Sequence, residues 1–436
     1  MSRPPLRPRE TRARALEREH AGCWPIGHLA GWRGASGYSS RTTAEEVVQG
    51  DTTETPTGGV VGKVAIVTGG NAGVGFETAR ALALGGARAV ILACRDTAAG
   101  ETAVERIKQT LKNDLSPDEN NFVEGVSATG ERSTQLITCI HLDLESFTSV
   151  HTFVKTFNQL NLPLHLLIHN AGIMPAPFLV TEDGHERTMQ VNFLSPFLLT
   201  RLLTPKLRER FTPGEPSSND DKNVHSTLSH DSRSSSRVVF VSSAVHRFTY
   251  PEGVRGVGEL DVTDVQSETD FQNQKVLHDP VKSYAESKLC VILLARILGV
   301  GFQTSRDPSR HHEVHFHSVH PGAIVTKGSE RARLESGGWR GAVLHAIGKP
   351  FLKSCQAGAA TTVRCCSMSC TESRLKNGSY HVNCEVKKPS KLACSVQLGR
   401  KVVRHAIRVT NRACDDAIAD DHFANVLLNG TYGYLN

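Results

Sequence analysis

The chain has 436 residues, a length that allows about three domains, although a single α/β domain can reach about 250 residues. Apolar residues make up 39% of the chain, which is somewhat low for a compact domain and indicates sizeable polar extensions. The formal net charge of +6 comes from 50 basic and 44 acidic residues without clustering. This balance argues against a nucleic-acid-binding protein.

Cysteine usage and hydropathy indicate the cellular compartment in which the protein is expected. The eleven cysteines include no C-x-x-C pair, no apolar run is long enough to span a membrane, and no secretory apolar region is present. We therefore expect reduced thiols in a cytoplasmic protein without a transmembrane segment, with peripheral membrane contact as an alternative. Residues 1–57 are arginine-rich and lack apolar periodicity, so they are expected to form a disordered or irregular extension.

Strand and helix patterns alternate from residue 58 onward. Short apolar runs predict buried strands at 63–68, 88–93, 137–142, 164–169, 237–242 and 314–319. Helical periodicity falls at 76–85, 98–111, 146–158, 185–208 and 281–298. This alternation predicts an α/β fold, a single Rossmann-type domain with a doubly wound parallel sheet over residues 58–405.

Two polar insertions and the last stretch of the chain do not fit the alternation. Segments 113–135 and 212–236 have too few apolar residues to fold alone, so we expect them to be surface loops or disordered insertions. Residues 406–436 have no clear period and are expected to form a C-terminal tail whose role the sequence does not indicate.

Glycines follow the first predicted strand directly. Gly69, Gly73 and Gly75 stand between that strand and a helical stripe. Glycine lets the backbone approach a pyrophosphate, and a helix N-terminus presents unpaired N–H groups and a partial positive charge. The strand–turn–helix context favours a nucleotide site over a tight turn without a ligand.

Arg95 bears on which nucleotide is bound. It lies about 20 residues beyond the glycines, where a dinucleotide-binding unit meets the adenosine ribose. An acidic residue there would bind the 2′-hydroxyl of NAD, whereas an arginine neutralises the 2′-phosphate of NADP. We therefore expect NADP. The neighbouring Asp96 keeps NAD as the alternative, and a solvated surface arginine is the structural alternative.

Four motifs stand along the chain: TGGNAGVG at 68–75, HNAG at 169–172, YAESK at 284–288 and HPGAIVT at 320–326. Taken together, they resemble the short-chain dehydrogenase/reductase family, which has Asn-Asn-Ala-Gly in place of HNAG, and in particular its retinol dehydrogenase and WW-domain oxidoreductase branch. The resemblance covers about residues 58–405 apart from the two insertions, and no WW module is recognisable before it. The resemblance implies an oxidoreductase that interconverts alcohols and carbonyls, and a homodimer is an expectation by the same resemblance.

Site residues are carried over position by position. The resemblance implies four catalytic residues: Asn192, Ser243, Tyr284 and Lys288. Together with Arg95, the residues expected at the cofactor are Thr68, Gly69, Asn71, Gly73, Val74, Gly75, Asp143, Asn170, Ala171, Gly172, Tyr284, Lys288, Pro321, Gly322 and Thr326. Asn192 is implied to support a water that leads protons from Lys288 to solvent; a hydrogen-bonded core asparagine is the alternative.

The chemistry of the implied catalytic residues follows from their spacing. Tyr284 and Lys288 are four residues apart on a predicted helix, so they share one face. The Lys288 cation and the charge of an oxidised nicotinamide should lower the phenol pKa from about 10, so that Tyr284 acts as general base or acid. Ser243, at the end of a strand, can hydrogen-bond the substrate oxygen. The alternative for Tyr284 and Lys288 is an ordinary helix-surface pair.

Two further segments affect the expected ligands. Residues 327–354 form a candidate lid with an apolar stripe, which suits a lipophilic retinoid-, steroid- or fatty-aldehyde-like substrate; a packing or dimer surface is the alternative. The histidines of 311–320 lie mostly on a predicted strand, where alternate side chains face opposite sides, so no metal site is expected. A noncatalytic dinucleotide-binding regulator on the same fold is the alternative function.

Overall fold

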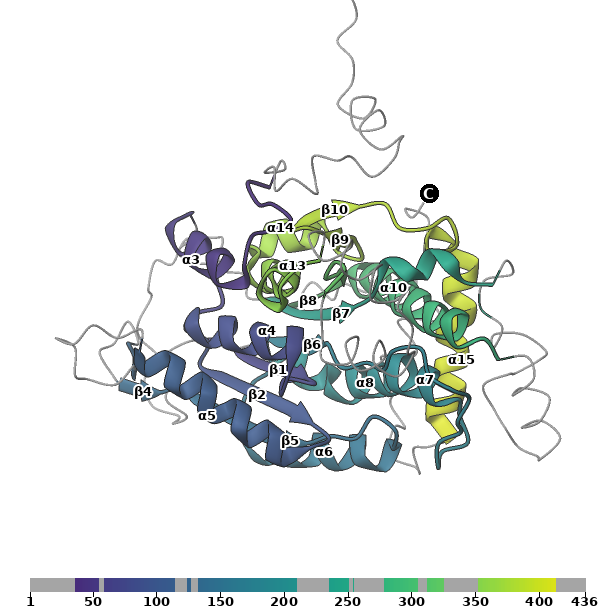
Figure 1. Cartoon of the computed structure of the whole chain (residues 1–436), viewed down its shortest axis with the longest axis horizontal. Coiled ribbons are helices and arrows are strands. Elements are labelled where there is room, and N and C mark those ends of the chain that lie inside the picture. Colours follow the sequence, from purple (N-terminus) through teal and green to yellow (C-terminus); the bar gives the residue numbers. More distant parts are fainter. Residues whose placement is uncertain are drawn as a thin grey trace, which may run out of the picture.

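The structure is a computed structural model that describes residues 36–54, 59–113, 124–126, 132–209, 235–250, 254, 278–304, 312–324 and 352–412. An eight-stranded sheet forms its centre, in the order β10-β9-β8-β7-β6-β1-β2-β5 (Figure 1). Neighbouring strands are parallel except for the β9–β10 pair. The strands are β1 (Val64–Thr68), β2 (Ala89–Cys94), β5 (Leu136–His141), β6 (Leu166–His169), β7 (Ser235–Val241), β8 (Glu313–His320), β9 (Tyr380–Val382) and β10 (Glu385–Lys387).

Helices cover both faces of the sheet, which is why every residue of β1 and β2 is buried (Figure 1). One face packs against α3 (Ala44–Glu54), α4 (Gly73–Leu84), α5 (Thr97–Asn113) and α13 (Cys355–Ser367). The other packs against α6 (Phe147–Gln159), α8 (Ser195–Leu207), α10 (Pro280–Thr304) and α15 (Val396–Arg412). The shorter helices are α7 (Arg187–Met189) and α14 (Cys370–Leu375), with single turns at Gln190–Leu194, Ala244–Phe248 and Leu392–Cys394. The predicted Rossmann-type parallel sheet is confirmed.

The N-terminal part of the chain differs from the expected irregular extension. Residues 44–54 form α3, which begins with a reciprocal cap: Thr43 N donates to Glu46 Oε2 (2.9 Å), and Glu46 N donates to Thr43 Oγ1 (3.2 Å). Val47 and Val48 are buried in the core between α4 and α13. The buried stripe is too short to give a clear period, and so it was not evident in the sequence.

The expected insertions and tail also differ in part. Within 113–135, β3 (Glu124–Val126) and β4 (Arg132–Thr134) pair as an antiparallel hairpin. Residues 212–234 lie outside the described residues, and 235–236 already belong to β7. At the C-terminus α15 continues past the predicted boundary at 405, because Ala406, Ile407 and Val409 are buried against α10.

Candidate active site

The predicted site lies at the carboxyl ends of the parallel strands. The glycine turn follows β1, the Asn-Ala-Gly segment follows β6, Ser243 follows β7, and Pro321 follows β8. In the sheet order, β1 stands between β6 and β2. Successive strands are added on one side of β1 up to β5 and then on its other side from β6, so the strand order reverses between β1 and β6. Open α/β sheets bind ligands at this point, outside the strand ends.

The glycine turn packs tightly against the loop after β6. Gly69 and Gly73 have positive φ angles of 65° and 59°, a region that favours glycine. A Cβ at Gly69 would lie 3.1 Å from Ala171, and one at Gly75 would lie 2.3 Å from the Asn170 amide nitrogen. Gly73 has no atom within 4 Å of such a Cβ. Backbone conformation therefore favours glycine at 69 and 73, and close packing requires it at 69 and 75.

The start of α4 leaves its N–H groups available. Its N-cap residue, Ala72, offers no side-chain acceptor, and the first turn contains no acidic residue. An uncapped helix N-terminus behind a glycine turn fits a pyrophosphate. The Cys94 side chain accepts hydrogen bonds from the backbone N–H groups of Asn71 and Gly70 in the glycine turn. A hydrogen bond from Cys139, together with these two, lowers the pKa of Cys94.

Other predicted cofactor residues organise the turn. Thr68 Oγ1 accepts hydrogen bonds from the backbone N–H groups of Asn170 (3.0 Å) and Ala171 (2.9 Å). The Asn170 amide donates back to Thr68 O (3.0 Å). Val74 lies in the first turn of α4, beside α13. Where the family has asparagine, His169 is buried and bonded to Thr200 Oγ1 (2.7 Å), so this departure serves the core.

Arg95 and Asp143 lie just beyond the ends of β2 and β5. The Arg95 guanidinium is 64% exposed and pairs with the Glu145 carboxylate at 2.7 Å. Asp143 Oδ1 accepts the N–H of Glu145 (2.9 Å). Asp96 Oδ1 accepts the N–H of Ala99 (2.9 Å) at the start of α5. Arg95 is thus accessible to a ligand. Asp96, the residue that left NAD as the alternative cofactor, instead caps the N-terminus of α5.

Ser243 and Tyr284 come together between the end of β7 and α10. The Ser243 side chain is hydrogen-bonded to the buried Tyr284 hydroxyl. Ser242, its neighbour, instead donates to Lys288 O (2.8 Å). The Lys288 ammonium donates to Val241 O (3.0 Å) and lies 5.7 Å from the centre of the Tyr284 ring. Serine, tyrosine and lysine therefore form one cluster.

Burial dominates the electrostatics of this cluster. It raises the pKa of Tyr284, and the hydrogen bond from Ser243 opposes that rise. It lowers the pKa of Lys288 to about 8. The sequence argument expected a lowered tyrosine pKa and included the positive charge of an oxidised nicotinamide. In the protein alone the direction is opposite, because exclusion of water disfavours the phenolate.

Asn192 lies in a single π-helical turn that separates α7 from α8. Its Oδ1 accepts Ile173 N (2.9 Å), and its Nδ2 donates to Ile173 O (3.1 Å) and Ser287 Oγ (3.0 Å). Gly172 lets the backbone of the loop after β6 lie close to both side chains, since a Cβ there would lie 3.0 Å from Asn192 Oδ1 and 3.1 Å from Lys288 Nζ. The amide is fully bonded and is close to the cluster.

The segment after β8 is described only in part. Gly322 has a φ of 96°, and a Cβ there would lie 2.7 Å from the Lys353 side chain. Ile324 pairs with Lys353 in a parallel bridge. Pro321 lies between β8 and this bridge. Thr326 and the candidate lid up to residue 351 lie outside the described residues.

The histidines of β8 have separate partners. His315 bonds to Glu313 (3.0 Å) and His317 to Ser373 (2.8 Å). His311 lies outside the described residues. Within the described ranges, no group of three or more histidine, cysteine or acidic side chains is arranged to hold a metal ion.

Comparison with known proteins identifies the family. The family model for short chain dehydrogenases matches residues 114–213. The WW domain-containing oxidoreductase of Gallus gallus is 35% identical over 350 residues, which cover 80% of this chain and 66% of that protein. Human retinol dehydrogenase 12 is 30% identical over 324 residues, covering 74% of this chain and 78% of that protein. The chain belongs to the short-chain dehydrogenase/reductase family.

A solved structure agrees with the short-chain dehydrogenase/reductase fold. An uncharacterised protein from Mycobacterium paratuberculosis superposes with a TM-score of 0.51 at 21% identity, covering 85% of this chain and 98% of that one. The two relatives come from the retinol dehydrogenase and WW-domain oxidoreductase branch, so that resemblance is confirmed. In the described part of the chain, no helix is both long and apolar enough to cross a bilayer.

Two residues that hydrogen-bond to the segments of the predicted site were not selected from the sequence. Ser287, which holds Asn192, also donates to Tyr284 O (2.8 Å). The buried Glu186 caps α7 and accepts a hydrogen bond from Ser283 Oγ (3.1 Å). This bond connects α7, which leads into the turn of Asn192, to α10. The position of Ser287 directly before the lysine was a signal that could have been used, whereas nothing local marked Glu186.

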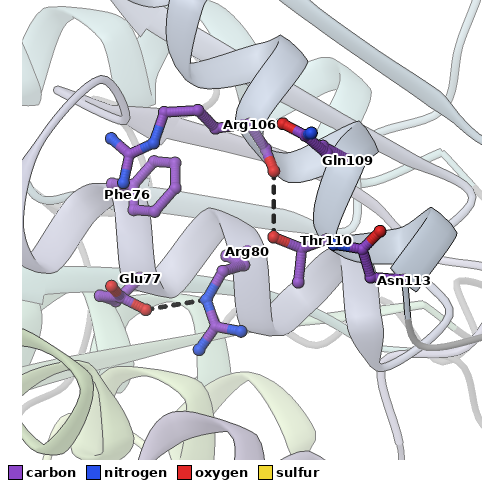
Figure 2. A pocket seen from close by; sticks show the side chains of 7 residues that line it. All are labelled: Phe76, Glu77, Arg80, Arg106, Gln109, Thr110 and Asn113. Atoms are coloured by element: carbon purple, nitrogen blue, oxygen red, sulfur yellow. Dashed lines mark hydrogen bonds and ion pairs between the residues drawn. The ribbon is translucent and has the colours of Figure 1, made fainter.

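A cavity of about 350 Å³ opens between α4 and α5, away from these residues (Figure 2). The Arg106 guanidinium lies 4.3 Å over the Phe76 ring, and Arg80 pairs with Glu77. None of the predicted site residues lines this cavity. Its lining is Phe76, Glu77, Arg80, Arg106, Gln109, Thr110 and Asn113. The cavity is therefore not the substrate site of the short-chain dehydrogenase/reductase reaction.

Proposed function

We propose that this protein interconverts a lipophilic alcohol and the corresponding carbonyl compound with NADP(H), and that Tyr284 transfers the proton. The observation that carries the proposal is the Ser243–Tyr284–Lys288 cluster at the strand ends, beside the loop after β6 that packs against the glycine turn. A bound nicotinamide dinucleotide supplies or accepts the hydride. NAD is the alternative cofactor.

The proposed roles of the chain's own groups follow from their contacts. The Ser243 hydroxyl can hydrogen-bond the substrate oxygen beside the Tyr284 phenol, so charge that develops on that oxygen meets two donors. Tyr284 then gives its proton to the oxygen in reduction or takes it in oxidation. Lys288, with a pKa of about 8, is well suited to re-protonate the phenol and to hold ribose hydroxyls.

The loop after β6 supports a lipophilic substrate. Residues 171–181 contain no charged side chain. Met174 and Leu179 in this stretch are 51% and 46% exposed, although it leads directly from the proposed cofactor site. One relative, retinol dehydrogenase 12, bears the name of a lipophilic alcohol. Retinoid-, steroid- or fatty-aldehyde-like compounds fit such a surface.

A panel of lipophilic aldehydes and ketones with NADPH, and of the matching alcohols with NADP⁺, tests the function through nicotinamide absorbance. We expect turnover with at least one lipophilic pair and weak activity with small polar analogues. Tight NADPH binding without turnover of any compound would instead favour the noncatalytic regulator.

Arg95 gives a separate prediction about the cofactor. Arg95→Ala should raise the KM for NADPH about 10- to 100-fold, because a charge-assisted contact to a phosphate is worth about 1.5–3 kcal/mol. The KM for NADH should hardly change. Glu145→Gln is the matched variant: it removes the carboxylate that competes for the guanidinium and should lower the KM for NADPH. An equal loss for both cofactors in Arg95→Ala would contradict the assignment.

A further inference from the structure

Four large apolar side chains are exposed next to the proposed site: Met174 (51%), Leu179 (46%), Phe248 (68%) and Val281 (52%). They come from three separate segments. Met174 and Leu179 belong to the loop after β6, Phe248 ends the short helix that begins after Ser243, and Val281 lies three residues before Tyr284 on α10. Burial of an apolar side chain is favourable, so a cluster of exposed ones indicates a contact surface.

Two hydrogen bonds and one cation–π contact join the segments into one continuous surface around the site. His278 bonds to Ala176 O (3.1 Å), which connects the loop after β6 to the start of α10. The Lys282 ammonium lies 5.2 Å from the Tyr250 ring, which connects α10 to the segment of Phe248. Arg247 donates to Lys388 O (2.8 Å), which adds the segment after β10. We call this surface, residues 173–179, 244–250, 278–282 and 385–391, the site rim.

The site rim is basic. It carries five cations, Arg247, Lys282, Lys387, Lys388 and Lys391, and two acidic residues, Asp279 and Glu385. Both acidic residues are engaged, with Lys282 at 3.9 Å and Lys387 at 2.8 Å. Among the described residues, the exposed Arg247, Lys388 and Lys391 have no acidic partner within ion-pair distance. Exposed apolar side chains flanked by unpaired cations are the composition of a surface that binds anionic lipid.

We propose that the site rim docks on the surface of an anionic lipid bilayer, so that a lipophilic substrate enters the site from the membrane. The docking stands on the rim alone, whereas the entry of substrate rests on the proposed function. A second copy of the chain is a poorer occupant. A symmetric dimer through this surface would set the same unpaired cations against each other.

Co-sedimentation of the full chain with phosphatidylcholine vesicles, with and without phosphatidylserine, tests the docking in the absence of cofactor and substrate. Binding should require phosphatidylserine and decline with added salt. The double variant Lys388→Glu/Lys391→Glu should bind at least about 30-fold more weakly, since each basic side chain near an anionic surface contributes about fivefold and the two new carboxylates are repelled by it. Phe248→Ser/Val281→Ser should also bind more weakly, by about tenfold or more.

Matched controls separate the rim from the remaining chain. Leu375→Ser removes a side chain that is 80% exposed on α14, and Lys108→Glu reverses an exposed charge on α5; both should bind vesicles as the unaltered chain does. The arginine-rich start of the chain is intact in every variant, so a loss reports on the rim. NADPH binding and the unfolding temperature, measured on each variant, verify the fold independently of lipid.

Three outcomes would overturn the proposal: no binding to phosphatidylserine vesicles, equal binding by the rim variants and the unaltered chain, or an equal loss in the controls. Light scattering adds one more. A dimer that Phe248→Ser/Val281→Ser dissociates, without vesicle binding, would assign the rim to a second copy. Because no turnover is measured, a failure of the proposed reaction would leave these results unchanged, and the two failures are distinguishable.

Discussion

Replacing Tyr284 with phenylalanine should lower kcat by about 10²- to 10⁴-fold, the range that a positioned general acid or base contributes. The ring is buried and the substitution removes only the hydroxyl that bonds to Ser243, so the packing around α10 is kept. The Kd for NADPH should stay within about twofold, because the glycine turn and Arg95 are untouched. Steady-state kinetics and a fluorescence titration with NADPH measure the two quantities.

Tyr38→Phe is the matched control for this substitution. Tyr38 also carries a phenol, but its ring lies beside Arg364 of α13, on the opposite face of the sheet from α10. Removing that hydroxyl should leave kcat within about twofold. Full activity of the Tyr284→Phe enzyme would remove tyrosine from the mechanism. A loss of NADPH binding as large as the loss of turnover would mean that the tyrosine supports the cofactor instead.

Acid should unfold this protein through its buried histidines. Burial is the largest cause that lowers the pKa of six of them. The pKa falls to about 3 for His165, His169 and His381. It falls to about 4 for His246, His312 and His320. An unfolded histidine titrates near about 6.5. Between these values the unfolded chain binds more protons than the folded one, so the stability is present above pH about 6.5 and is lost as the pH falls.

The expected size of this effect is large. At pH about 5, each such histidine lowers the free energy of unfolding by about 2 kcal/mol, and six would together match the whole stability of a typical domain. Urea midpoints measured between neutral pH and pH about 5 should therefore fall steeply. His169→Asn, which restores the family residue, should reduce by about one the number of protons that the chain takes up on unfolding at this pH. A midpoint that does not change over this range would contradict the account.

The alternation of strands and helices was readable from the sequence because both faces of the sheet are covered. Strands such as β1 and β2 are continuous apolar runs, and the helices between them have one buried stripe. The three-residue strands β9 and β10 are too short to show a period. Helix α3 was hidden for a similar reason, since only a few of its side chains enter the core.

Local motifs indicated the site, but tertiary contacts decide how its members act. Ser243 and Tyr284 are 41 positions apart, yet each could be selected by its own motif, and the structure joins them. The partners that hold them could not be selected in this way. Glu145 restrains Arg95 from another strand end, and Glu186 bonds to Ser283 across two helical segments. The raised tyrosine pKa likewise depends on burial, which a motif does not reveal.

The central claim is hydride transfer between NADP(H) and a carbinol carbon, and isotope transfer tests it most directly. The full chain is incubated with a lipophilic aldehyde and NADPH deuterated on the transferable face of its nicotinamide, and the alcohol is examined by mass spectrometry. The account predicts one deuterium on the carbinol carbon for each NADPH oxidised, and almost no product from the Tyr284→Phe enzyme. NADPH oxidation that yields alcohol without deuterium would contradict it.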